Sequence, residues 1–209
     1  MISRQVSKRD GKTTVMVAVG EKVIGFIALT DTLRPDIQIT LKKLHHLGIQ
    51  KTAILTGDNA SVAAAIAKQA GLSEYYANLT PEDKAIAIRD LVKKYGVVAM
   101  VGDGVNDAPA LATATVGIAM GGAGTDVALE TADVALMGDN LDRLPFTVGL
   151  GRATRRIILQ NLVIALGVIT ILVISSLTGW TGIGVAILFH EGSTIVVVLN
   201  ALKLLHYKT

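Results

Sequence analysis

Along the first 140 residues, short apolar runs typical of strands alternate with segments whose apolar residues recur at helical spacing. Short runs rich in β-branched residues predict strands at 13–19, 22–29, 51–55, 97–101, 116–120 and 134–137. Apolar residues at helical spacing predict helices that begin at Pro35, Asn59 and Thr80, and shorter helices near 108–114 and 126–132. Because strands and helices alternate, we expect an α/β fold: a doubly wound parallel sheet with helices on both faces.

The last third of the chain has a different pattern. Residues 157–177 contain no charged side chain, and residues 183–205 contain only Glu191 and Lys203. Each run is long enough to cross a hydrocarbon core of about 30 Å, which needs about 20 residues. We therefore expect an α-helical transmembrane hairpin with a tight link that contains Trp180. The alternative is a buried helical hairpin of a soluble protein.

Composition agrees with one soluble unit followed by one membrane unit. Of the 209 residues, 51% are hydrophobic, and the excess is concentrated in the last third. The chain has no cysteine, which excludes a disulfide framework and thiolate metal sites. The net charge of +3 is small, and no aromatic platform accompanies the basic residues, so we expect no nucleic-acid partner.

Basic residues flank the two apolar runs and predict their orientation. Four arginines precede the first run and two lysines lie at the end of the second, at Arg143, Arg152, Arg155, Arg156, Lys203 and Lys208. The link between the runs has no basic residue. Because cytoplasmic flanks are enriched in lysine and arginine, we expect both ends of this segment to be cytoplasmic, in the plasma membrane.

Two carboxylates lie directly after the strand predicted at 97–101. Asp103 and Asp107 belong to the run Gly-Asp-Gly-Val-Asn-Asp-Ala-Pro-Ala-Leu at 102–111. Open α/β sheets bind ligands at the carboxyl ends of their strands, and carboxylate oxygens suit Mg²⁺. Glycine on both sides of Asp103 would let the backbone approach a ligand closely. The pair predicts a magnesium site, and an ordinary Asp/Gly/Asn turn is the alternative.

Two upstream pieces would complete such a site. Thr56-Gly57-Asp58 follows the strand at 51–55, where a hydroxyl and backbone N–H groups form a phosphate cradle; a simple helix N-cap is the alternative. Lys84 lies near the start of the helix that begins at Thr80-Pro81, where a cation is unfavourable unless an anion is close. A hydroxyl, an ammonium group and paired carboxylates are what Mg²⁺-dependent phosphoryl transfer requires.

The second apolar run contains His190-Glu191-Gly192-Ser193-Thr194. Ionisable residues at membrane depth are costly and usually mark an ion pathway. An imidazole and a carboxylate suit first-row divalent metals better than Cu(I). A structural polar contact between helices is the alternative, and it applies equally to Asn161 in the first run.

These motifs resemble those of the P-type cation-transporting ATPases, members of the haloacid-dehalogenase-like superfamily. The resemblance implies that Thr56, Gly57, Asp58 and Lys84 contact the phosphoryl group, that Asp103 and Asp107 hold Mg²⁺, and that Asn106 completes the site. It also implies ATP and Mg²⁺ as cofactors, with ATP bound mainly outside this chain.

The resemblance further implies a division into domains. Asp31-Thr32-Leu33-Arg34-Pro35 resembles the hinge between nucleotide-binding and phosphorylation domains. Residues 1–30 would then end the nucleotide-binding domain, residues 31–142 would be the C-terminal portion of the phosphorylation domain, and residues 143–209 the juxtamembrane segment and two spans, at about 157–177 and 183–205.

One motif of the family is absent. The phosphorylated aspartate of these pumps lies in Asp-Lys-Thr-Gly-Thr, which this chain does not contain. We therefore expect the C-terminal part of a longer pump, which needs its N-terminal part as a partner and is inactive alone. A truncated remnant, a split-pump subunit, or a membrane-anchored phosphatase with Asp31 as nucleophile are the alternatives.

Two spans after the catalytic domain resemble the heavy-metal branch of these pumps. His190-Glu191-Gly192-Ser193-Thr194 is similar to the signature of its cobalt-type subgroup, and Asn200 and Leu204 continue that pattern. The resemblance implies that His190, Glu191, Ser193 and Thr194 bind the transported cation. It favours Co²⁺ and leaves Zn²⁺, Cd²⁺, Ni²⁺ and Fe²⁺ open.

Overall fold

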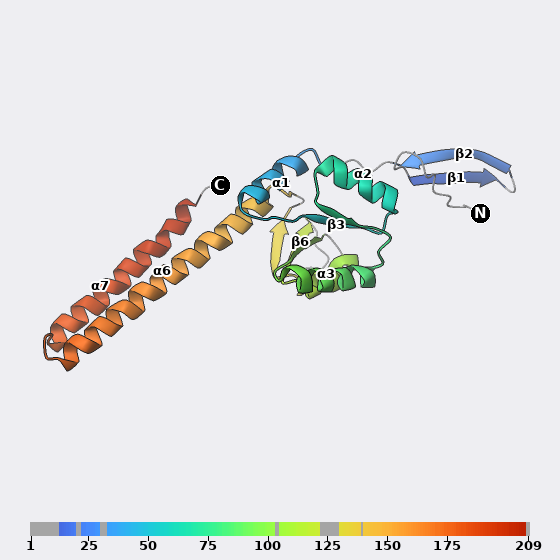
Figure 1. Ribbon diagram of the computed structural model, residues 1–209. Coiled ribbons are helices and arrows are strands. Elements are labelled where there is room, and N and C mark those ends of the chain that lie inside the picture. The colour runs from blue at the N-terminus through green and yellow to red at the C-terminus, as the bar shows by residue number, and fades with distance from the viewer. Residues whose placement is uncertain are drawn as a thin grey trace. The chain divides into compact units, whose positions relative to one another are not determined.

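The computed structural model describes residues 13–19, 22–29, 33–102, 105–121, 130–138 and 140–207. The chain divides into two compact units, Met1–Arg143 and Leu144–Thr209. Strands and helices alternate in the first unit, and two long helices run side by side in the second (Figure 1).

The first unit begins with a hairpin. Strand β1 (Thr13–Val19) pairs antiparallel with β2 (Lys22–Leu29), and the register shifts between Val17 and Ala18. Both strands were predicted with these bounds. Among the described strands, neither pairs with a strand outside the hairpin.

Parallel strands and helices make up the rest of the unit. Their order is α1 (Ile37–His46), β3 (Ala53–Leu55), α2 (Ala60–Ala70), β4 (Glu74–Tyr76), α3 (Pro81–Tyr95), β5 (Ala99–Gly102), the short 3₁₀ turn η1 (Val105–Asp107), α4 (Ala108–Thr113), β6 (Val116–Gly121) and β7 (Val134–Met137). Strand β3 pairs in parallel with β4, and β5, β6 and β7 form a second parallel group in that order. The predicted α/β class with parallel strands is confirmed.

Several predicted bounds were wrong by two residues. The first helix begins at Ile37 rather than Pro35, because Asp36 occupies the N-cap position. The strand expected at 51–55 begins at Ala53, and β4 was not predicted at all because three residues are too few to show a period. Most of the helix predicted near 126–132 lies outside the described residues.

One apolar core positions the ends of β3 and β5. Ile88 and Leu91 from α3 pack with Met100 from β5 and with two residues of α4, Ala110 and Leu111. Leu55 and Tyr76, from the other strand pair, pack against this cluster. Since Leu55 immediately precedes Thr56 and Met100 lies two residues before Gly102, the core holds both polar motifs near one another.

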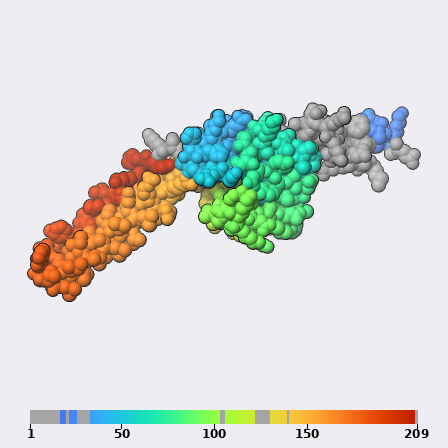
Figure 2. Space-filling view, viewed as in Figure 1, coloured from blue at the N-terminus to red at the C-terminus, as the bar shows by residue number. Residues whose placement is uncertain are grey.

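The second unit is a helical hairpin formed by α6 (Arg143–Leu177) and α7 (Ile183–Leu202), followed by the short 3₁₀ turn η2 (Lys203–His206). Both helices are long and apolar enough to cross a membrane, and none of the residues in their most apolar segments is buried within the structure. Figure 2 shows the side chains of both helices exposed along the visible face of the hairpin. The hairpin therefore differs in exposure from a buried hairpin of a soluble protein. Long exposed apolar surfaces favour an apolar environment.

Polar side chains join α6 to α7 near the end of the hairpin. The Asn200 side chain is 8% exposed and donates to Asn161 Oδ1 at 2.9 Å and to Gln160 Oε1 at 3.2 Å. Lys203 Nζ donates to Asn200 Oδ1 at 2.9 Å. Asn161 thus makes a helix–helix hydrogen bond, which was one of its two expected roles.

Candidate functional site

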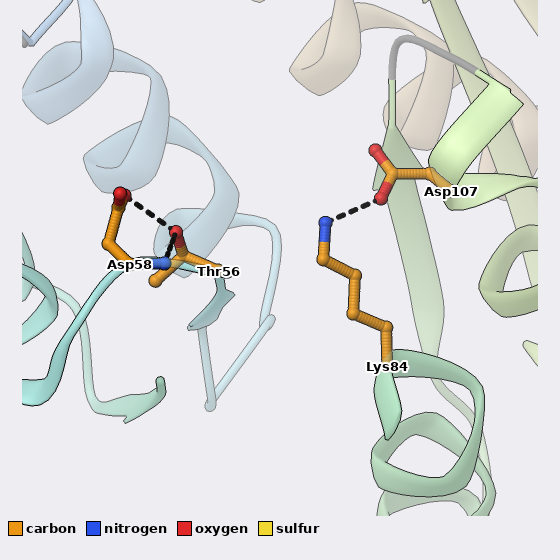
Figure 3. A network of polar contacts seen from close by, with 4 residues as sticks. All are labelled: Thr56, Asp58, Lys84 and Asp107. Carbon is orange, nitrogen blue, oxygen red and sulfur yellow. Dashed lines mark hydrogen bonds and ion pairs between the residues drawn. The ribbon is translucent and has the colours of Figure 1, made fainter. Parts of the chain in front are cut away.

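The turn after β3 is stabilised by its own side chains and by the segment after β4. Thr56 Oγ1 donates to Asp58 Oδ2 at 2.8 Å and accepts a hydrogen bond from the Asp58 N–H at 3.1 Å (Figure 3). The Thr56 N–H donates to the Tyr76 carbonyl at 3.0 Å, and the Leu79 N–H donates to the Thr56 carbonyl at 3.1 Å. The Thr56 hydroxyl is therefore held in a fixed position at the carboxyl end of β3.

Asn78 is a positioning residue that the sequence analysis missed. Its φ of 55° lies in the left-handed region, which asparagine tolerates better than most residues. In this conformation its N–H donates to the Asp58 carbonyl at 2.7 Å. The adjacent Leu79 carbonyl would lie 3.3 Å from a Cβ added to Gly57, so the segment packs tightly on the turn. The available signal was an asparagine in the short link between a strand and an N-capped helix.

Asn59, rather than Thr56 or Asp58, caps the helix that follows this turn. Asn59 Oδ1 accepts a hydrogen bond from the Val62 N–H at 3.0 Å, at the start of α2. The alternative expectation was that the Thr56 motif serves as a helix N-cap. Asn59 fills that position, and the side chains of Thr56 and Asp58 do not cap α2.

A capping box fixes the helix that carries Lys84. Thr80 Oγ1 accepts from the Asp83 N–H at 3.2 Å, and Asp83 Oδ2 accepts from the Thr80 N–H at 3.1 Å. Hydrogen bonds from the Thr80 hydroxyl and N–H hold the pKa of Asp83 below its usual range. The stability that this lowered pKa contributes is present near neutral pH and is lost as the pH falls through the folded-state pKa.

Lys84 and Asp107 form an ion pair between α3 and η1. Lys84 Nζ lies 2.8 Å from Asp107 Oδ1, and the two side chains are 17% and 13% exposed (Figure 3). Lys84 was expected to have an anion close by, and Asp107 is that anion. Among the described residues, Asp107 Oδ2 makes no hydrogen bond, whereas Oδ1 accepts from Lys84.

Gly102 makes room for the Asp107 side chain. A Cβ built on Gly102 would lie 2.8 Å from both Cβ and Oδ2 of Asp107, closer than real Cβ contacts. This glycine was expected to let the backbone approach a ligand. The described structure gives a different reason, because the group that approaches Gly102 is a side chain of the same motif.

Substituting Gly102 with alanine should therefore displace Asp107 and weaken its pair with Lys84. We expect a loss of about 1–3 kcal/mol in unfolding free energy, the usual cost of overpacking. Thermal unfolding of the detergent-solubilised chain measures this loss. Gly25→Ala is the matched control, because nothing lies within 4 Å of its added Cβ. Equal stability of the two variants would contradict the steric argument.

The remaining residues of the predicted magnesium site are only partly described. Asp103 lies outside the described residues, and Asn106 is exposed in η1. Asp107 fits Mg²⁺ by its chemistry, because it is a carboxylate whose Oδ2 makes no hydrogen bond within the described residues. Within the described ranges, no group of three or more acidic, histidine or cysteine side chains could hold a metal by itself.

The residues predicted to bind the transported cation lie on one unbroken helix, α7. The hydroxyls of Ser193 and Thr194 donate back to the His190 carbonyl at 2.7 and 3.3 Å. His190 and Glu191 are neighbours in sequence, so their side chains point about 100° apart around the helix. The neighbouring side chains of His190 and Glu191 therefore point to different sides of α7.

The least exposed positions of α7, Ala186, Ser193, Val197 and Asn200, recur three, four and seven positions apart and show which side of α7 faces α6. A groove of about 520 Å³ lies beside this contact. Its lining residues on α7 are Leu188, Phe189, Gly192, Ser193 and Val196. Glu191 and Thr194 are both exposed and lie outside that stripe, and helical geometry places Glu191 on the side of α7 opposite to it. That side is open to a ligand or to another part of a larger protein, and α6 does not cover it.

Comparison with known proteins defines the class of this molecule. Residues 3–115, more than half of the chain, match the family described as haloacid dehalogenase-like hydrolase. The parallel strands, with polar motifs at their carboxyl ends, agree with that match. The chain belongs to the haloacid dehalogenase-like hydrolases.

Closer similarity is to metal-transporting ATPases. A probable cadmium-transporting ATPase of Listeria monocytogenes is 51% identical over 209 residues, which cover 99% of this chain and 29% of that protein. The zinc/cadmium/lead-transporting P-type ATPase of Escherichia coli K12 is 50% identical, over 93% of this chain and 26% of that protein.

A solved structure extends the similarity to both units. The crystal structure of a zinc-transporting PIB-type ATPase in the E2.Pi state matches with a TM-score of 0.81 and 50% identity, over 93% of this chain and 32% of that chain. This chain therefore spans less than a third of the length of these relatives.

Proposed function

We propose that this chain is the C-terminal part of an ATP-driven pump for divalent heavy-metal cations. The ion pair between Lys84 and Asp107, next to the core that also holds the Thr56 turn, carries the proposal. It brings together a cation and a carboxylate that lie 23 residues apart in sequence. Similarity of about 50% to pumps that transport cadmium, zinc and lead supports this function over a generic phosphatase.

The chain would contribute part of the phosphoryl-transfer site. The Thr56 hydroxyl and the Lys84 ammonium would bind the phosphoryl oxygens, and the Asp58 and Asn78 contacts would keep the hydroxyl in place. Asp107 would hold Mg²⁺ through Oδ2, and the ion would neutralise phosphoryl charge when bound. Asp103 and Asn106 would complete this magnesium site. The phosphorylated aspartate and most of the ATP contacts would come from the rest of the pump.

The transported cation would be bound on the exposed side of α7 that carries Glu191. Glu191 and Thr194 would supply ligands on that side. His190 and Ser193 would contribute from the flank of the helix, since Ser193 lines the groove beside α6. Further ligands would come from other helices of the pump. The relatives are named for cadmium, zinc and lead. We therefore propose Zn²⁺ and Cd²⁺ as cargo, in place of the Co²⁺ that the local motif favours.

ATP hydrolysis by the full-length pump tests this choice of cation. We expect Zn²⁺, Cd²⁺ and Pb²⁺ to stimulate hydrolysis at lower free concentrations than Co²⁺. Stimulation by Co²⁺ alone would overturn the proposed cargo. Hydrolysis that no divalent heavy metal stimulates would overturn the pump itself.

We infer the orientation of the hairpin from charge. The basic residues lie at the two ends of the hairpin and the link has none, so both ends would face the cytoplasm and the link the opposite side of the plasma membrane. Labelling of cysteines introduced at Thr178 and Tyr207 in intact cells would distinguish the two sides: only the first should react with an impermeant reagent.

A further inference from the structure

A second pocket in the helical hairpin is chemically unlike the groove beside Ser193. It has a volume of about 880 Å³ and changes character along its length. Along α6 the lining runs from the cations Arg152, Arg155 and Arg156 through Leu159 and Gln160 to Val163 and Ile164, and α7 adds Asn200 and Lys203.

The pocket is built on one side of α6. Its lining residues there recur three and four positions apart, so they form a continuous stripe on the helix. From α7, the buried Asn200 bonds Gln160 and accepts from Lys203, which fixes the Lys203 ammonium at the rim. Helix packing therefore fixes Lys203 at the cationic end, while the three arginines are exposed beside it.

The positive charge of this pocket has no counter-ion among the described residues of the second unit. The three arginine side chains make no ion pair or hydrogen bond with described residues. Glu191 is the sole acidic residue of residues 144–209, and it lies nine positions before Asn200, about 14 Å along the helix. Three exposed guanidinium groups and the Lys203 ammonium, which donates to Asn200, thus surround one cavity with no carboxylate beside them among the described residues of this unit.

We propose that this pocket binds an anionic phospholipid, with the headgroup phosphate at the arginines and an acyl chain along Leu159 and Val163. The cationic end lies just before the apolar run at 157–177, at the depth of lipid headgroups. Basic pockets between membrane helices at this depth bind anionic headgroups. A free phosphate would use only the cationic end, whereas a lipid matches both ends. This site is independent of the proposed metal transport.

Native mass spectrometry of the chain, released from nanodiscs of equal parts phosphatidylcholine and phosphatidylglycerol, tests the proposal. We expect preferential retention of phosphatidylglycerol. The variant Arg152→Gln/Arg155→Gln/Arg156→Gln should reduce that preference at least about tenfold, because each basic residue near an anionic surface contributes about a factor of five. Lys42→Gln/Lys43→Gln/Lys68→Gln removes the same charge from exposed positions of the first unit and should keep the preference.

Three results would overturn the proposal. The first is equal retention of both lipids by the unchanged chain. The second is an equal loss of preference in the Lys42/Lys43/Lys68 control, which would indicate bulk charge. The third is displacement of phosphatidylglycerol by inorganic phosphate, which would indicate a site for a free anion. If the arginine variant fails to insert, Lys203→Gln decides the outcome: a loss of a few-fold supports the pocket, and unchanged retention overturns it.

Discussion

Lys84→Ala should lower metal-stimulated ATP hydrolysis by the full-length pump at least about 100-fold, the usual cost of removing one charge-stabilising group from a transition state. The substitution removes the ammonium proposed to bind the phosphoryl oxygens. It also leaves the Asp107 carboxylate, only 13% exposed, without its 2.8 Å partner. Both effects reduce the same reaction, because an unpaired carboxylate repels the incoming phosphate.

Lys93→Ala is the matched control on the same helix. Lys93 also pairs with an aspartate, Asp90 at 3.1 Å, but these side chains are 71% and 65% exposed. An exposed pair of this kind contributes at most about 1 kcal/mol, so hydrolysis should stay within about twofold of the unchanged pump. Thermal unfolding of both variants separates loss of catalysis from loss of fold. Similar activities of Lys84→Ala and Lys93→Ala would show that Lys84 has no role in the reaction.

The elements of the first unit were predictable where the signal is local. Thr80 and Pro81 with Asp83 specify the start of α3, and the bonds of the capping box are all within three residues. Gly71 and Gly96 end their helices with positive φ, as glycine does at helix C-termini. Such signals need no knowledge of the rest of the fold.

Contacts between distant segments were not predictable in the same way. The Lys84–Asp107 pair joins residues 23 apart, and the sequence indicated only that an anion was required. Asn78 holds the Thr56 turn through a backbone bond that no periodicity encodes. Gly102 makes room for Asp107, a steric reason that appears only when η1 folds back on β5.

The membrane unit shows the same division. Length and apolarity predicted both helices, but the hairpin extends farther than the apolar run, since α6 begins at Arg143. The sequence left Asn161 with two roles, and the 2.9 Å bond from Asn200 selects helix packing. Periodicity alone does not show which side of α7 faces α6. The burial of the α7 residues shows it, and with it the exposed position of Glu191.

Glu191→Ala should abolish metal-stimulated ATP hydrolysis by the full-length pump while its expression and membrane insertion persist. Glu191 is the sole acidic side chain of residues 144–209, so its loss removes all formal negative charge that this unit can offer a divalent cation. It contacts no described residue through a hydrogen bond or ion pair, so the substitution should not disturb packing between α6 and α7. Hydrolysis measured across a series of Zn²⁺ and Cd²⁺ concentrations gives the result.

Thr170→Ala is the control for changing a polar residue within a span. The Thr170 hydroxyl donates to the Leu166 carbonyl at 2.8 Å on its own helix, so its removal should leave metal stimulation unchanged. Glu191→Gln then separates charge from shape, because a carboxamide keeps the size of the side chain but not its charge. If attraction of a divalent cation is the essential property, this variant should lose metal stimulation as Glu191→Ala does. Full stimulation in Glu191→Ala would remove this residue from the ion pathway and leave the exposed side of α7 to helix packing alone.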